Sequence, residues 1–117
     1  MIIINVLISF ILFQNSNAQI NLSTNNLACV CSCESFNSTN IILVSKNIQI
    51  VDPATFSGLV SLQRLYLNFN QLEEIHQNTF NGLTSLRTLY MHSNQIAVQR
   101  TTFNGLTSLE ELWLYSN

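Results

Sequence analysis

The acidic residues are the first candidates for chemistry, and their arrangement does not favour catalysis. Two adjacent pairs occur, Glu73-Glu74 and Glu110-Glu111, and Asp52 is the only aspartate. Neighbouring residues of a strand face opposite sides, so neither pair could serve one substrate as a general acid and base. The chain also has no Ser-His-Asp spacing, glycine-rich phosphate loop or His-x-x-x-His motif. We therefore expect no enzyme, no catalytic residues and no bound cofactor.

Three cysteines form the second candidate site, since Cys29, Cys31 and Cys33 fall close together. A metal site needs about four ligands, and the two histidines, His76 and His92, lie far away in sequence. The Cys-x-x-Cys spacing of a redox motif is absent. An odd count leaves at least one thiol unpaired, and a bridge between Cys31 and Cys33 would be strained. The cluster therefore indicates a structural role and no metal site.

The elements that hold these residues must be built from an almost uncharged chain. Its 117 residues allow one domain, and 47% of them are hydrophobic. Only 9% are charged, against roughly 25% in a typical soluble domain, so amides and hydroxyls must supply the polar surface. The net charge of −2 excludes the basic surface of a nucleic-acid-binding protein. It gives equally little support for electrostatic attachment to an anionic membrane.

Residues 1–18 have the pattern of a cleaved signal peptide. The stretch Ile2–Phe13 is almost continuously apolar, and Ser16 and Ala18 fit the small-x-small pattern before a cleavage site that leaves Gln19 first. The apolar run is too short for a transmembrane helix, which needs about 20 residues. A buried strand or helix of the core is the alternative. We expect export, and no membrane span within this chain.

A repeated pattern occupies the second half of the chain. The motif Leu-x-x-Leu-x-Leu-x-x-Asn begins at Leu62 and Leu109, and at Leu86 with Met in place of the third Leu. A Phe-x-Gly-Leu sequence closes each unit, and its Phe residues are spaced by 24 and then 23 residues. Leu-x-Leu is typical of a short strand with one buried face. One such unit cannot bury that face alone, so successive units must stack.

This pattern resembles the leucine-rich repeat family, in its extracellular 24-residue form, over roughly residues 41–117. The resemblance implies an α/β fold, a right-handed leucine-rich repeat solenoid with a parallel sheet on its concave face. Residues 48–117 would hold about three and a half repeats, the last one incomplete. An all-β meander, with Asn81-Gly82 and Asn104-Gly105 as hairpin turns, is the rival fold. The residues flanking these dipeptides do not alternate as strands would, which argues against it.

The resemblance also assigns the interior of each coil. Asn70, Asn94 and Asn117 would form a ladder of side-chain hydrogen bonds to buried backbone groups, which makes them structural. Val98 is expected to fill the interior as Ile75 does one repeat earlier. The third repeat is one residue short in its second half, which predicts a local distortion of the convex side. The last coil is not closed, as expected for a fragment or a truncated product.

The cysteine cluster resembles the N-terminal cap of extracellular leucine-rich repeat proteins, which assigns residues 19–47 to a cap. That cap usually has four cysteines, and the fourth position here falls on about Leu43. The resemblance implies a disulfide between Cys29 and Cys33, with Cys31 left free. Two Asn-x-Ser/Thr sequons in the same segment agree with export, and the glycosylation candidates are Asn21 and Asn37.

The binding candidates are the x positions of the strand motif, which point outward on the concave side in this family. Tyr66, Tyr90 and Trp113 occupy the same position in successive repeats and would stack in a column. Tyr and Trp are enriched in binding hot spots, although aromatic pairing across strands could instead stabilise only the sheet. Phe69 and Ser93 also fall at x positions. The partner-binding candidates are Arg64, Tyr66, Asn68, Thr88, Tyr90, His92, Glu111, Trp113 and Tyr115.

Together these features predict a secreted or extracellular module that binds a protein partner, and no nucleic acid, on its concave face. The module would be a fragment of a secreted protein or of a receptor ectodomain. It would be attached to a membrane only if a segment beyond Asn117 supplied the anchor. The alternative is a truncated gene product with no independent function beyond a structural repeat segment.

Overall fold

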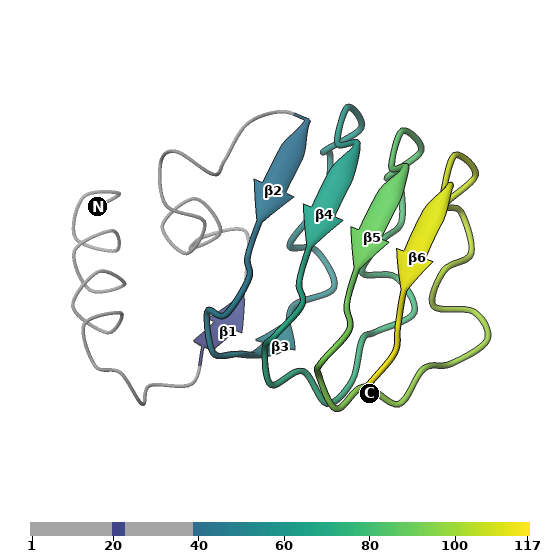
Figure 1. Cartoon of the computed structure of the whole chain (residues 1–117). Helices are drawn as coiled ribbons and strands as arrows, with labels where there is room; N and C mark the ends of the chain where they lie inside the picture. Colours follow the sequence, from purple (N-terminus) through teal and green to yellow (C-terminus); the bar gives the residue numbers. More distant parts are fainter. Residues whose placement is uncertain (1–19, 23–38) are drawn as a thin grey trace, which may run out of the picture.

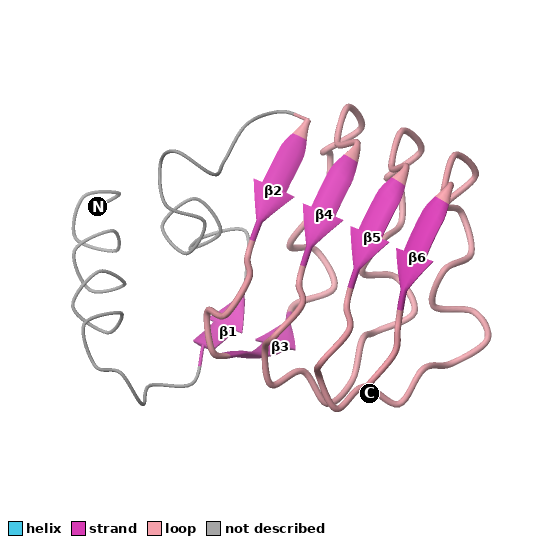
Figure 2. Cartoon of the chain, viewed as in Figure 1, coloured by secondary structure: helices cyan, strands magenta, loops and turns pink. Residues whose placement is uncertain are grey.

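The computed structural model describes residues 20–22 and 39–117. The predicted signal peptide, the three cysteines and Asn37 lie outside these residues, so the predictions made for them stay predictions. The described residues form strands joined by turns, with no helix (Figure 2), and none of their elements is a helix that could cross a membrane. The strands are β1 (Ile20–Leu22), β2 (Asn40–Ile42), β3 (Ile48–Val51), β4 (Arg64–Tyr66), β5 (Thr88–Tyr90) and β6 (Glu111–Trp113).

Four of these strands form one parallel sheet in the order β2-β4-β5-β6, and Figure 1 shows them side by side. Their register follows the repeat, because Ile41, Leu65, Leu89 and Leu112 are successive partners. Each repeat therefore contributes one strand and then returns through turns to start the next. A second, two-stranded parallel sheet pairs β1 with β3. The parallel sheet predicted from the repeat is thus present, and it begins with β2, inside the segment assigned to the cap.

The inward faces of the coils form a single core. Leu65 and Leu89 are fully buried, and a second layer of rings lies on the returning segments. Phe80 stacks between Phe56 and Phe103, with ring centroids 6.3 and 6.1 Å away. Gly82 follows with a φ of 83°, a left-handed conformation that glycine adopts without steric cost. Turns and stacked rings thus build the side opposite the sheet, and the helical part of the expected α/β fold is not found in the described residues.

The short third repeat leaves the sheet undisturbed. Arg64, Thr88 and Glu111 remain register partners although the two intervals differ by one residue. The loop absorbs the difference, since Val98 is 44% exposed whereas Ile75 is 3% exposed. The expectation that Val98 fills the core is therefore wrong. Removing one residue from a loop with fixed ends turns the following side chain to the other side.

The last coil is covered on one side only. Leu112 is 36% exposed, whereas its partner Leu89 is fully buried between β4 and β6. Leu114 is partly buried against the core. The inward-facing leucine of a strand is therefore fully buried only where a coil packs on each side of it, as expected when stacked coils share one core.

Candidate functional site

An asparagine side chain follows each of the strands β4, β5 and β6 and binds the backbone there. The Asn70 side-chain nitrogen donates to the carbonyl oxygens of Leu43 and Leu67, at 2.7 and 2.9 Å. Its oxygen accepts from the backbone N–H groups of Lys46 and Ile48, at 2.9 and 3.1 Å. Asn70 thus satisfies buried backbone groups of its own coil and of the preceding one, which would otherwise cost free energy.

The other two asparagines repeat this arrangement. Asn94 donates to the carbonyls of Leu67 and Met91, at 3.0 and 2.9 Å, and accepts from the N–H of Leu72 at 3.1 Å. Asn117 donates to two carbonyls, at 2.6 and 3.2 Å, but it is exposed. The three side chains therefore fix the backbone directly after the strands, and through it the direction of the side chains on the outer face of the sheet.

The residue before each of these asparagines has a left-handed backbone. Phe69, Ser93 and Ser116 occupy this position, and Ser45, which is followed by Lys46, is their equivalent one repeat earlier; φ lies between 56 and 57° in all four. Left-handed backbone costs a residue with a Cβ roughly 1–2 kcal/mol, and a bulky residue there is unusual. Phe69 is the only large one of the four, and its ring is 54% exposed. Burial therefore does not explain why an aromatic ring is held at this turn.

Three aromatic rings form a column on the outer face of the sheet, where the repeat placed them. Tyr66 and Tyr90 meet edge to face, with centroids 5.1 Å apart. Tyr90 and Trp113 stack at 4.4 Å with an angle of 13° between their planes. Both tyrosines are half-buried, whereas Trp113 is 39% exposed. The rings stabilise one another as aromatic pairs do, and Trp113 is the most exposed of the three.

A second row of rings lies beside this column, and it corrects one expectation. His92 stacks on Tyr115 with centroids 4.5 Å apart and meets the edge of Phe69 at 5.2 Å. These neighbours leave His92 only 5% exposed, and Asn68 is 7% exposed. The sequence pattern predicted that Asn68 and His92 would be accessible to a partner, but both side chains are buried. Within the described part of the chain, Asn68 Oδ1 and His92 Nδ1 are buried without a hydrogen-bond partner.

Polar residues line the other side of the aromatic column. The Arg64 guanidinium donates to Asn40 Oδ1 at 3.2 Å, and the Tyr90 hydroxyl donates to Glu111 Oε1 at 2.8 Å. The hydrogen bond to this carboxylate is the main cause that raises the pKa of the Tyr90 phenol above its ordinary value. Thr88 lies between Arg64 and Glu111 in the register. This side is thus positive at β4 and negative at β6.

One residue of the face was missed by the sequence reasoning. Ile42 is the register partner of Tyr66 and is 41% exposed. The triplet Ile41-Ile42-Leu43 precedes Leu65-Tyr66-Leu67 by 24 residues, so the repeat spacing could have identified it. It lay within the segment assigned to the cap. We define the aromatic face as Ile42, Tyr66, Phe69, Tyr90, Trp113 and Tyr115.

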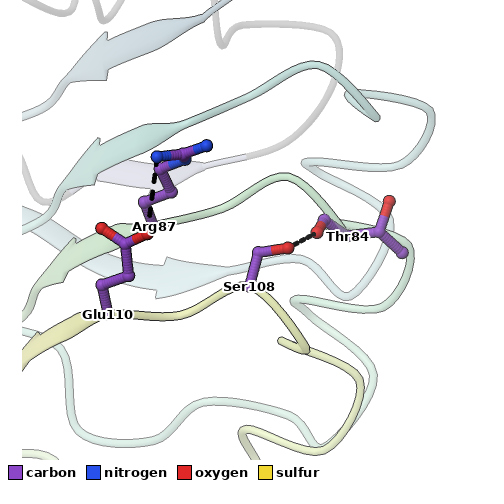
Figure 3. Close-up of polar contacts among 4 residues, drawn as sticks. All are labelled: Thr84, Arg87, Ser108 and Glu110. Atoms are coloured by element: carbon purple, nitrogen blue, oxygen red, sulfur yellow. Dashed lines mark hydrogen bonds and ion pairs between the residues drawn. The ribbon is translucent and has the colours of Figure 1, made fainter.

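The charged residues just before β5 and β6 lie outside this face. Arg87 Nη1 and Glu110 Oε1 are 3.4 Å apart, with both side chains more than half exposed (Figure 3). Ser108 Oγ donates to the carbonyl of Thr84 at 2.6 Å on the neighbouring turn (Figure 3). These contacts join neighbouring coils at the ends of their strands.

The aromatic face offers stacking and apolar contact, with one charge of each sign along its border. The described residues contain no group of three His, Cys, Asp or Glu side chains that could hold a metal ion. The arrangement suits the recognition of another molecule by its surface.

Comparison with known proteins agrees with the repeat geometry. The family model for the leucine rich repeat matches residues 37–96, slightly more than half of the 117 residues. The matched range includes β2, which lies before the first repeat assigned from the sequence. No curated protein matches the chain. Domains of this family generally mediate protein–protein interaction and are not enzymes. The chain belongs to the leucine-rich repeat family.

Proposed function

We propose that this protein is an extracellular module that binds a protein partner through its aromatic face. The observation that carries the proposal is the exposure of large apolar side chains on one side of one sheet. Ile42, Phe69, Trp113 and Tyr115 are between 39 and 57% exposed there. Aromatic residues are enriched in the central contacts of protein interfaces, and contiguous exposed apolar patches commonly mark such interfaces.

Phe69 argues against a purely structural role for the face. Aromatic pairing across strands would account for the column of Tyr66, Tyr90 and Trp113. It does not account for Phe69, which stands outside that column in a costly backbone conformation with its ring mostly in water. Serine occupies the same turn in the other three coils. A ring kept there at the expense of stability supports a role in contact with another molecule.

The extracellular location forms part of the proposal and is supported by the sequence. Residues 1–18 would direct export and be removed, and residues 19–47 would form a cap with a bridge between Cys29 and Cys33. Asn21, in β1, has an exposed side chain, which suits a glycosylation site. Residues 48–117 would hold the repeats that follow this cap.

A selection from a random-peptide display library tests the binding face. We expect peptides selected on the purified chain to lose at least tenfold in affinity when Phe69→Ser and Tyr115→Ser are combined, because these changes remove two exposed rings. The matched control is Val60→Ser, which removes an exposed apolar side chain from a turn outside the sheet. It should leave the affinity unchanged.

Calorimetric titration of the selected peptides into each variant gives the affinities. The proposal would be wrong if the peptides bound the double variant as tightly as the unchanged chain. It would also be wrong if no selected peptide depended on the face, since an accessible set of hot-spot residues should select ligands of its own.

A further inference from the structure

We propose that the aromatic face binds an acidic side chain of its partner at its border, with the carboxylate held by Arg64 and an adjacent aliphatic residue of the partner packed on Ile42 and Tyr66. The inference rests on the proposed function and names the chemistry of the partner where β2 and β4 pair. The cation of this site is on β4, which lies between β2 and β5 in the sheet.

The pairing of β2 with β4 places the three side chains together. Arg64 and Tyr66 are two residues apart in β4, so they lie on the same side of the sheet. The Arg64 guanidinium reaches across to β2, because its Nη1 donates to Asn40 Oδ1 at 3.2 Å. Ile42 is two residues from Asn40 in β2 and is the register partner of Tyr66. The cation therefore lies next to the apolar pair, roughly 7 Å away along the strands.

Arg64 is a cation without a carboxylate partner. It is exposed, and the one ion pair within the described part of the chain joins Arg87 to Glu110. Among the outward side chains of β2, β4, β5 and β6, Arg64 is the only cation and Glu111 is the only anion. Strands β4 and β6 are roughly 10 Å apart, so salt at physiological strength screens most of the repulsion between Glu111 and a carboxylate bound at Arg64.

The side chain of Asn40 orients the guanidinium. Its Nδ2 donates to Thr39 Oγ1 at 3.3 Å, and its Oδ1 accepts from Arg64. An arginine has five N–H groups, and this hydrogen bond uses one of them. The planar guanidinium can donate two parallel N–H groups to one carboxylate, which is the geometry that makes arginine a specific ligand for acidic side chains.

The apolar pair selects what stands beside the acid. Ile42 is 41% exposed and Tyr66 is half-buried. An aliphatic side chain next to the carboxylate would cover this surface and be stabilised by its removal from water. Inorganic phosphate would bring more than one negative charge to a single guanidinium and no apolar surface, and a basic residue would be repelled. The site therefore fits Asp or Glu beside a large aliphatic residue.

The arginine Nε–H signals in an NMR spectrum provide a direct probe, because Arg64 is one of only three arginines. Its signal is identified by its loss in Arg64→Gln. We expect acetyl-Glu-Leu-amide to shift this signal in a saturable way at constant ionic strength. Acetyl-Gln-Leu-amide has the same shape without the charge and should bind at least about fivefold more weakly. Acetyl-Glu-Gly-amide lacks the aliphatic group and should bind at least about twofold more weakly.

Variants of the chain test the site itself, with the backbone N–H signal of Tyr66 reporting the binding. Arg64→Gln should weaken the glutamate peptide at least about fivefold. Arg87→Gln is the matched control, because it removes the same charge from a residue outside the aromatic face and should leave the binding unchanged. Asn40→Asp keeps the shape of the amide and supplies Arg64 with a carboxylate from the chain itself. It should therefore weaken the peptide at least about threefold.

Equal binding of the glutamate and glutamine peptides would overturn the inference, as would equal effects of Arg64→Gln and Arg87→Gln. An unchanged or increased affinity in Asn40→Asp would contradict it, and so would the absence of any shift with the glutamate peptide. Acetyl-Gln-Leu with a free terminal carboxylate tests the other source of this group. Binding tighter than that of the glutamate peptide would mean that the site takes a chain end, and the assignment to an acidic side chain would be wrong.

The display selection separates this inference from the proposed function. If the selected peptides depend on Phe69 and Tyr115 but keep their affinity when each acidic residue is replaced by its amide, the binding face stands and the carboxylate site is wrong. If they contain an acidic residue whose replacement costs the same fold-change as Arg64→Gln, both are supported.

Discussion

Polar side chains at two kinds of buried position have opposite effects on this protein. Asn70 and Asn94 are almost fully buried, and their side chains join carbonyl and N–H groups of neighbouring coils. Asn68 and His92 are equally buried, but each has an atom without a hydrogen-bond partner in the described part of the chain. The first pair stabilises the turns, whereas the second is destabilising at the unpaired atoms. The imidazole of His92 lies between the rings of Phe69 and Tyr115.

The ladder predicts a strong dependence on position. Asn94→Ala should lower the free energy of unfolding by about 3 kcal/mol, because it leaves buried carbonyl and N–H groups unpaired. Asn117→Ala removes the same side chain from an exposed coil, where water can replace it, and should cost less than about 1 kcal/mol. Urea denaturation followed by circular dichroism measures both. Equal losses would show that burial does not set the strength of the ladder.

Within a repeat, the loop can lose one residue whereas the strand keeps its register. The register of β4, β5 and β6 continues through a repeat that is one residue shorter than its neighbour. Strand pairing aligns backbone groups along the whole element, so a slip would reverse every side chain. The loop opposite the sheet carries no such constraint, and the exposed side chain of Val98 is the local result.

Restoring the missing residue should therefore stabilise the protein. Insertion of a glutamate between Ala97 and Val98 makes this loop match the sequence around Ile75, which is buried. Val98 would then turn inward, and its burial should raise the free energy of unfolding by about 1 kcal/mol. Thermal denaturation gives the change. The same insertion combined with Val98→Ser is the control, and an equal gain in that variant would contradict the explanation.

The whole molecule is held together with little help from charge. Only 9% of its residues are charged, and the ion pair between Arg87 and Glu110 has both side chains more than half exposed. Exposed pairs contribute little because water and salt screen them. Stacked apolar layers and amide hydrogen bonds supply the cohesion of the described coils.

Stability should accordingly depend little on salt. Between about 0.05 and 0.5 M NaCl, the free energy of unfolding is expected to change by less than about 0.5 kcal/mol. Glu110→Gln should have an effect within the same limit, because its partner Arg87 remains solvated. Urea denaturation at the two salt concentrations checks both statements. A loss of several kcal/mol at high salt would mean that charge pairs carry the fold.

The repeat spacing alone predicted where β4, β5 and β6 lie, that they pair in parallel, which of their leucines point inward and which asparagines bind the backbone; it did not place β2. These follow from local periodicity, because equal spacing brings equivalent residues together in every coil. Only the tertiary structure decided which outward residues are accessible. Asn68 and His92 share the outward direction of Tyr115, yet rings from adjacent coils cover His92. Exposure depends on neighbours brought in from other coils, whose packing one strand's sequence does not contain.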